Sequence, residues 1–359
     1  MVAVAVAAAA AALPGAKAGA AGTPTAEVAE LHFRMATPVL VVARGHDERL
    51  LRAAVRQAFT SLRRLEERLS TFIASSDASR LNEAAGRGAI LVSPDLSALL
   101  ATSTRLAADS RGSFSILVGP LVELWHRAAE SGIEPDARAI AAARSLVDPA
   151  GLVVVGNRAR LARAGMRIDL GGIAKGFAAD RLLAGLREAG AEAALVNLGG
   201  SSIAAFGDAA DGGRGWPIEL PQPDGDTAGP APILRLRNAA LSTSATRGHV
   251  LAVGSRTIGH IVDPRTGLPL ALDATAVVRH RSATVAEADS KALLVLDAEA
   301  GFEVLRAHGA DGIRVAPGAP IACSAGFRAE VPACRVGAFA AVAVAPERSK
   351  AQAARTESQ

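Results

Sequence analysis

The feature that most constrains the fold is the stretch Arg167-Ile168-Asp169-Leu170-Gly171-Gly172-Ile173-Ala174-Lys175-Gly176. Ile168 and Leu170 are strand-like, the two glycines allow positive φ and close backbone approach, and apolar residues recur at helical spacing from Ile173 onward. A helix that opens on glycines exposes unpaired N–H groups at its positive end, so this bend is expected to attract an anion, and Lys175 adds a charge. An ordinary strand–turn–helix with Lys175 in solvent is the open alternative.

Two familiar phosphate-binding motifs do not describe this bend. It has neither the Walker pattern, with four residues between its first glycine and Gly-Lys-Ser/Thr, nor the Gly-x-Gly-x-x-Gly of Rossmann domains. The sequence leaves open a phosphate site of another type.

Further blocks along the chain specify that type. The runs at 169–176 and 260–267 stand in the order and spacing typical of the ApbE family, the FAD:protein FMN transferases, which the chain resembles over roughly residues 33–315. Other matching blocks are Met35-Ala36-Thr37, Leu69-Ser70-Thr71-Phe72, Ser79-Arg80-Leu81-Asn82, Val196-Asn197-Leu198-Gly199-Gly200 and Leu241-Ser242-Thr243-Ser244.

The resemblance implies an α+β fold in which mixed or antiparallel sheets pack with helices. The residue pattern favours the same class, since strand-like and helix-like segments are segregated along the chain. We expect an FAD-binding domain over residues 26–345, between a leader at 1–25 and a polar tail at 346–359 that we expect to be disordered.

The resemblance also implies the chemistry. The family binds FAD, uses Mg²⁺ on its pyrophosphate and transfers FMN to a threonine hydroxyl of an acceptor flavoprotein, releasing AMP. By resemblance, Asp289 and the Ala174 carbonyl hold the ion, and His260 and Asp263 lie beside the reacting phosphate. The residues expected to bind FAD are Met35, Ser70, Asn82, Asp169, Gly171, Gly172, Lys175, Asn197, Gly199, Gly200, Thr243, Ser244 and His260.

Several of these residues have a purely structural alternative. Asp289 is suited to support its own helix, His260 to be a core histidine, and Asn197 to pin a strand end. Asp263 begins a good turn sequence, in which its carboxylate accepts local N–H bonds. His260 and Asp263 converge only if the chain turns before Pro264, because a spacing of three puts them on opposite faces of a strand.

Departures from the family pattern bear on activity. Leu293 stands where the family has a threonine that serves the ion, and Ser115 and Leu117 replace a carboxylate and a hydroxyl. Arg247 stands where the family has an aromatic residue. The sequence therefore supports an active transferase, with two alternatives: a degenerate homologue that binds FAD without transfer, or one that hydrolyses FAD to FMN and AMP.

Composition and the chain ends bound the partners and the location. The 39 basic and 35 acidic residues leave a small positive balance, and no basic block with interleaved aromatics indicates a nucleic-acid surface. The apolar run Val2–Leu13 is too short for a stable membrane span, which takes ~20 residues. It fits the core of a secretory signal, although no basic residue precedes Lys17, and it predicts an extracytoplasmic protein of the periplasm or cell envelope.

Two cysteines and several local patterns complete the expectations. Cys323 and Cys334 either form a disulfide or are two unpaired buried thiols. The other expected elements are a strand within 26–45, helices over Glu48–Ser70, Ser93–Ser110 and Pro135–Ser145, a surface loop over 207–232, antiparallel strands at Ile233–Leu236, Ala239–Leu241 and Val250–Val253, and a helix that opens at Ala286.

Overall fold

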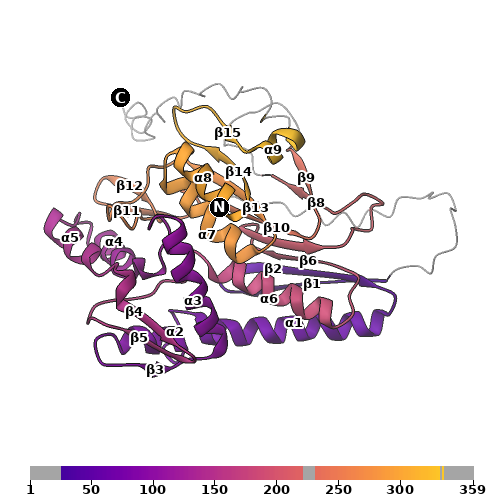
Figure 1. Ribbon diagram of the computed structural model, residues 1–359, viewed down its shortest axis with the longest axis horizontal. Helices are drawn as coiled ribbons and strands as arrows, with labels where there is room; N and C mark the ends of the chain where they lie inside the picture. Colours follow the sequence, from indigo (N-terminus) through magenta and orange to yellow (C-terminus); the bar gives the residue numbers. More distant parts are fainter. Residues whose placement is uncertain (1–25, 221–230, 332–333, 335–359) are drawn as a thin grey trace, which may run out of the picture.

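The computed structural model describes residues 26–220, 231–331 and 334 and confirms the α+β class. At its centre is an eight-stranded sheet in the order β1-β2-β6-β7-β10-β13-β14-β15, and each neighbouring pair is antiparallel (Figure 1). Its strands are β1 (Ala26–Arg34), β2 (Thr37–Gly45), β6 (Ala193–Leu198), β7 (Ser202–Phe206), β10 (Ala239–Ala245), β13 (Thr275–His280), β14 (Asp311–Val315) and β15 (Ala322–Cys323).

The first predicted strand is in fact a hairpin. Met35 and Ala36 both have positive φ, 50° and 58°, and reverse the chain between β1 and β2. Two successive residues in this conformation match the twist of antiparallel strands, which favours a two-residue turn. Sequence reasoning missed the turn because neither residue is glycine, asparagine or aspartate.

Helices α1 (Glu48–Leu69), α6 (Ala174–Glu188) and α7 (Ala283–Val295) cover one face of the sheet. The predicted α1 is confirmed: Asp47 caps its N-terminus through the N–H of Leu50, and one helical stripe is buried. The predicted start of α7 at Ala286 is wrong by three residues. Ser282 caps the helix, and the Asp180 carboxylate accepts the N–H groups of Ala283 and Thr284, so a partner from α6 fixes the first turn.

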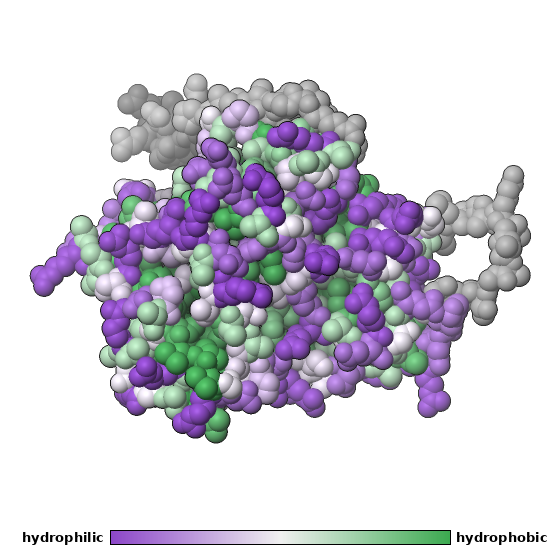
Figure 2. Space-filling view, in the orientation of Figure 1, coloured by the Kyte–Doolittle hydropathy of each residue, from purple (hydrophilic) through white to green (hydrophobic). Residues whose placement is uncertain are grey.

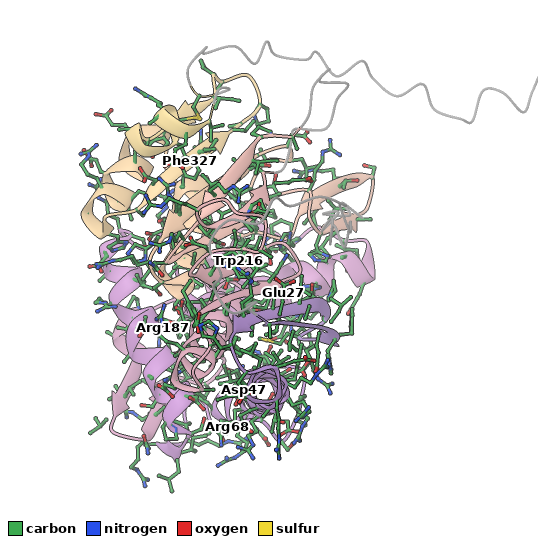
Figure 3. The ribbon with its side chains drawn as sticks, turned by 90° about the vertical axis from the view of Figure 1, so that its right-hand side faces the viewer. Glu27, Asp47, Arg68, Arg187, Trp216 and Phe327 are labelled. Atoms are coloured by element: carbon green, nitrogen blue, oxygen red, sulfur yellow. A yellow bond between two sulfur atoms is a disulfide. The ribbon has the colours of Figure 1, made fainter. Side chains whose placement is uncertain are left out.

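The opposite face of the sheet carries a second apolar layer. β8 (Trp216–Glu219) pairs with β9 (Ile233–Leu236), and α9 (Ala325–Glu330) packs beside them. Figure 3 places Trp216 and Phe327 on one side of the sheet and Arg187 of α6 on the other. The expected surface loop over 207–232 is therefore wrong in part, since β8 lies within it and Trp216 is buried with its indole N–H donated to the Phe206 carbonyl.

A side lobe is inserted between β2 and β6. It contains α2 (Asp77–Glu83), α3 (Pro94–Asp109), α4 (Gly119–Ser131), α5 (Ala137–Ser145) and a small sheet of β3 (Ile90–Leu91), β5 (Arg158–Leu161) and β4 (Leu152–Val155). The predicted helices α3 and α5 are confirmed, α3 with its Ser93 cap. Apolar surface is visible over the small sheet in Figure 2, where Leu91, Val153 and Val155 are exposed.

Three smaller parts complete the architecture. α8 (Ala298–His308) packs on α7, and the hairpin of β11 (Val250–Val253) and β12 (Arg256–Gly259) packs on α4. Cys323 and Cys334 form a disulfide, so the first of the two expectations for them is confirmed. Within the described ranges no helix combines the length and apolar character that a bilayer crossing requires. The expected leader at 1–25 and tail at 346–359 lie outside the described residues.

Candidate functional site

The chain approaches the glycine bend in an extended form that is not a strand, contrary to prediction. Ile168 donates its backbone N–H to the Asn82 side-chain oxygen over 2.7 Å, and its carbonyl accepts from the Asn82 amide nitrogen over 3.0 Å. A side chain of α2 thus replaces the neighbouring strand that the alternation of Ile168 and Leu170 predicts. Asn82, expected to bind FAD, is buried and spends both polar atoms on this segment.

The bend itself presents open backbone. Gly171 donates its N–H to the Asp169 carboxylate over 2.8 Å, and neither Gly171 nor Gly172 has positive φ, so that part of the prediction is wrong. A Cβ at Gly172 would approach only the ends of the Lys291 and Phe114 side chains, at 3.6 and 3.8 Å. α6 begins immediately afterwards without a side-chain cap. In its first turn the N–H groups of Ala174 and Gly176 are donated to the Leu170 carbonyl and to Glu287, so the Lys175 N–H and the positive end of the helix dipole are left to face this bend.

A close helix contact fixes what faces the bend. Gly176 in the first turn of α6 lies against the Ala283 carbonyl at the start of α7, where a Cβ would come within 2.3 Å of that oxygen. The Gly176 N–H is donated to the Glu287 carboxylate, whose side chain is 1% exposed. Glu287 thus lies at the junction of the two helices and opposite the bend.

Two ammonium groups share the other oxygen of this carboxylate. Nζ of Lys175 lies 3.8 Å and Nζ of Lys291 lies 3.6 Å from Glu287 Oε1. Burial lowers the pKa of Lys291 to about 8, and the charge of Glu287 opposes that shift. Lys291 is therefore mostly protonated at neutral pH. The alternative that places Lys175 in solvent does not hold, since its side chain is only 26% exposed.

The predicted metal ligand Asp289 points elsewhere. Positions two apart on a helix are separated by about 200°, so Asp289 and Glu287 lie on opposite faces of α7. The Asp289 carboxylate accepts from Nδ1 of His308 of α8 at 2.9 and 3.0 Å, and burial raises its pKa while this bond opposes the shift. Leu293 is fully buried in the apolar layer between α7 and β13. The structure therefore does not bring Asp289 to the bend beside Ala174.

The residues that do face the bend do not fit a divalent cation. Mg²⁺ prefers several oxygen ligands and a few waters. Here Glu287 supplies one carboxylate, already engaged by an N–H and by two ammonium groups that would repel a metal. Nor do three His, Cys, Asp or Glu side chains gather as a metal site anywhere in the described part of the chain. The donor set at the bend is therefore that of an ammonium-rich anion site and not of a Mg²⁺ site.

One end of the large sheet gathers most of the residues expected to bind FAD. Pairing of β2 with β6 brings Thr37 beside the β6–β7 turn, where a Cβ on Gly199 would lie within 2 Å of the Thr37 hydroxyl and φ is 63°. Asn197 accepts the Gly200 N–H over 2.7 Å, which is the strand-pinning role that the sequence left open. Met35 lies in the adjacent β1–β2 turn.

The same end receives β10. The Ser244 hydroxyl is hydrogen-bonded over 2.7 Å to Ser290 of α7, so its side chain lies on the face of the sheet that α7 covers. Glu287 and Lys291 belong to the same helix. Thr243 donates its backbone N–H to the Ser201 carbonyl, and strand alternation directs its side chain to the opposite face. Only one of these two predicted hydroxyls therefore faces the helices.

The C-terminal end of α1 lies at this end of the sheet too. The Met35 N–H is donated to Glu66 of α1 over 2.7 Å, and Ser70 follows directly as the helix C-cap. The Ser70 hydroxyl accepts the N–H of Phe72, whose ring is 97% exposed. An exposed phenylalanine just after the C-terminal end of α1, at this end of the sheet, is a candidate for stacking on a planar ring. Phe72 belongs to a block that matches the family but was not among the residues expected to bind FAD.

His260 and Asp263 differ in their surroundings. Nδ1 of His260 lies 2.8 Å from the His249 carbonyl; burial lowers the pKa of His260, and the charges of His249, Lys291 and Lys175 add to that shift. The two lysines of the bend are thus close enough for their positive charges to lower the pKa of His260. The Asp263 carboxylate is instead taken up by Arg265, through the backbone N–H at 2.8 Å and the guanidinium at 2.9 Å. Asp263 thus shows the local turn geometry that was its structural alternative.

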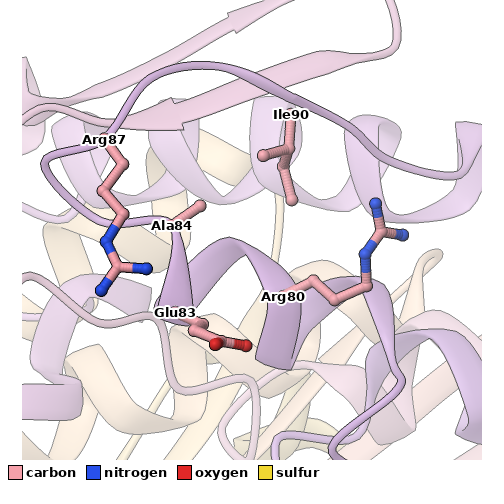
Figure 4. A pocket seen from close by; sticks show the side chains of 5 residues that line it. All are labelled: Arg80, Glu83, Ala84, Arg87 and Ile90. Carbon is pink, nitrogen blue, oxygen red and sulfur yellow. The ribbon is translucent and has the colours of Figure 1, made fainter.

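A separate open pocket lies in the side lobe. It is lined by Arg80, Glu83, Ala84, Arg87 and Ile90 (Figure 4). None of these is among the predicted site residues, and Arg80 is already paired with Asp77 over 3.0 Å. We place the candidate site at the bend and the adjoining sheet end, where the predicted residues and the charges converge.

Comparison with known proteins identifies the family of this chain. The model of the family described as "ApbE family" matches residues 35–314, which include the bend, the glycine turns and the two lysines. The chain belongs to the ApbE family. Among its curated relatives are FAD:protein FMN transferases of Klebsiella pneumoniae (strain 342), 32% identical over 68% of this chain and 75% of the relative, and of Treponema pallidum (strain Nichols), 32% identical over 77% and 80%.

Solved structures show the same fold for this ApbE-family chain. The apo form of Pseudomonas stutzeri flavinyl transferase ApbE superposes with a TM-score of 0.72 at 25% identity, covering 85% of this chain and 97% of that one. The flavin transferase ApbE from Vibrio cholerae gives 0.73 at 23% identity, covering 86% and 100%. The α+β class and the recognised family are thus both confirmed.

Proposed function

We propose that this chain is an FAD:protein FMN transferase, which moves FMN from FAD to a threonine hydroxyl of an acceptor flavoprotein and releases AMP. The observation that carries the proposal is the convergence of an uncapped helix start with Lys175 and Lys291 at the glycine bend. An FAD diphosphate is anionic and matches this charge. Membership of a family whose curated relatives are named FAD:protein FMN transferases supports the same assignment.

The proposed reaction is a displacement at phosphorus. The threonine oxygen attacks the FMN-side phosphorus of the FAD diphosphate, and the bond from that phosphorus to the bridging oxygen breaks. AMP leaves with the bridging oxygen and its electron pair, while the threonine proton passes to a base. If water attacks instead, the products are FMN and AMP.

His260 is suited to accept the proton. A carbonyl oxygen only accepts hydrogen bonds, so the 2.8 Å contact with His249 fixes the proton on Nδ1 and leaves the lone pair on Nε2. The lowered pKa keeps the ring neutral at pH 7. A neutral imidazole with an available lone pair is what a general base requires.

The test is incubation of the purified protein with FAD, with and without a threonine-containing acceptor peptide. Covalent FMN on the peptide, read by mass spectrometry together with AMP release, supports transfer. Free FMN plus AMP without modified peptide supports FAD hydrolysis. Bound but intact FAD under both conditions would overturn the transferase and leave the FAD-binding homologue.

We also propose that the chain acts outside the cytoplasm. The Cys323–Cys334 disulfide supports this location, because such bonds persist mainly in oxidising compartments. Fractionation of cells that express the full chain should recover it outside the cytoplasm with both thiols oxidised. Recovery in the cytoplasmic fraction with both thiols reduced would contradict the proposal.

A further inference from the structure

We propose that the Lys291 ammonium supplies the cationic charge at the FAD diphosphate that the family resemblance assigns to Mg²⁺, so that this chain binds and processes FAD without a divalent metal. The inference rests on the proposed function and deepens it. The groups around Glu287 do not fit Mg²⁺, so another positive charge must neutralise the diphosphate of FAD.

The first support is position. Lys291 is one helical turn after Glu287 on α7, and its Nζ lies 3.6 Å from that carboxylate. Its Cε is 3.6 Å from the place where a Cβ on Gly172 would be, so the ammonium stem lies directly over the bend. A charge held there meets a ligand that approaches the open backbone of Gly172.

The second support is residue choice. Of the 39 basic residues in the chain, 35 are arginine and four are lysine. Within the residues that the structure describes, the only lysines are Lys175 and Lys291, and both face Glu287. Because the chain favours arginine so strongly, two lysines beside the same carboxylate indicate that this position requires ammonium groups. An ammonium is a compact point charge with three donors, closer to a small cation than a planar guanidinium is.

The third support is charge balance. Two ammonium groups beside one carboxylate leave a single positive charge, to which the uncapped start of α6 adds its partial charge. Glu287 orients the lysines, since its other oxygen is fixed by the Gly176 N–H. Such a fixed positive group stabilises phosphoryl oxygens during displacement. The junction thus already contains the charge that a bound metal would bring.

The experiment measures FAD affinity by quenching of flavin fluorescence, in EDTA and in excess Mg²⁺. The proteins are the wild type, Lys291→Met, Lys291→Thr and, as the matched loss of one positive charge elsewhere, Arg105→Met on the exposed side of α3. Circular dichroism melts confirm that each variant is folded. AMP release is followed under the same conditions with the acceptor peptide.

We expect wild-type affinity to be equal in EDTA and in Mg²⁺. Lys291→Met should bind about tenfold more weakly in EDTA, the loss of one charge-assisted hydrogen bond, while Arg105→Met stays at the wild-type value. Lys291→Thr should regain affinity when Mg²⁺ is added, because it removes the repelling charge and offers an oxygen.

Wild-type binding that is lost in EDTA and restored by Mg²⁺ would overturn the inference, and if AMP release returns with the metal, the proposed transferase stands. Equal affinity of Lys291→Met and wild type in EDTA would overturn it as well. FAD binding in EDTA that depends on Lys291, without AMP release or modified peptide under any condition, would instead support the ammonium site and refute the transferase.

Discussion

At the scale of single residues, the candidate site is defined by which polar atoms are already engaged. Asn82 spends its side chain on the backbone of Ile168, and Asp263 spends its carboxylate on Arg265. By contrast, His260 retains a lone pair and Phe72 is almost fully exposed. The residues available to a ligand are therefore a subset of those expected to bind FAD, together with Phe72.

His260 predicts a pH dependence. Its pKa lies below the ordinary value of 6.5, mainly because of burial, so the ring is neutral and competent at pH 7 and becomes charged only as the pH falls through that lowered pKa. The acid limb of the rate profile should lie below pH 6.5, and His260→Asn should remove the limb and most of the rate. A limb centred at or above pH 6.5 would contradict this role.

Phe72 predicts a contribution to flavin affinity. Stacking of an aromatic side chain on a base contributes roughly 1–3 kcal/mol, so Phe72→Ala should weaken FAD binding about tenfold. The control is Leu50→Ala, another exposed apolar side chain, at the opposite end of α1. Fluorescence titration measures both, and equal affinities would show that the Phe72 ring does not contact FAD.

At the scale of elements, the site depends on how closely α6 approaches α7. The first turn of α6 rests on the first turn of α7 through Gly176, and this contact directs Glu287 and Lys291 toward the bend. Asp180, further along α6, caps α7 and fixes the same contact from the other helix. The positions of the candidate site residues therefore depend directly on how α6 packs against α7.

A matched pair of glycine substitutions in α6 tests this dependence. Gly176→Ala puts a Cβ against the Ala283 carbonyl and should cost roughly 2 kcal/mol or more of unfolding free energy and reduce FAD affinity. Gly185→Ala meets no atom within 4 Å and should stabilise the helix by up to about 1 kcal/mol. Urea denaturation measures both. Equal stability of the two variants would contradict the close contact.

At the scale of the whole molecule, the sheet joins parts that are distant in sequence. The β1–β2 and β6–β7 turns and the end of β10 lie at one end of it. The C-terminal end of α1 reaches that end through Glu66 and Met35, and α7 reaches it through Ser290 and Ser244, with Lys291 beside Gly172 of the bend. On its other face the paired strands β8 and β9 and helix α9 form a separate apolar layer, which contains the Cys323–Cys334 disulfide.

The disulfide predicts a dependence of stability on redox state. Cys323 and Cys334 are 11 residues apart, and closing a loop of that length stabilises a fold by about 3 kcal/mol in the chain-entropy account. Cys323→Ser should lower the unfolding free energy by that order, and added reductant should lower the wild type equally. FAD binding should persist, since the bond lies across the sheet from the bend. A variant as stable as the oxidised wild type would refute this contribution.

The sequence by itself determined the family, the α+β class, the position of the bend and the helices α1, α3 and α5, because these depend on local spacing and on motifs read in order. Tertiary structure alone decided which face of α7 meets the bend. The sequence of α7 offers an acidic residue at two neighbouring positions, Glu287 and Asp289, followed four positions later by Lys291 and by Leu293. Local pattern cannot decide which of these two pairs faces the bend. The approach of Gly176 to Ala283 sets the rotation of the helix, which turns Glu287 and Lys291 toward the bend and Asp289 toward His308.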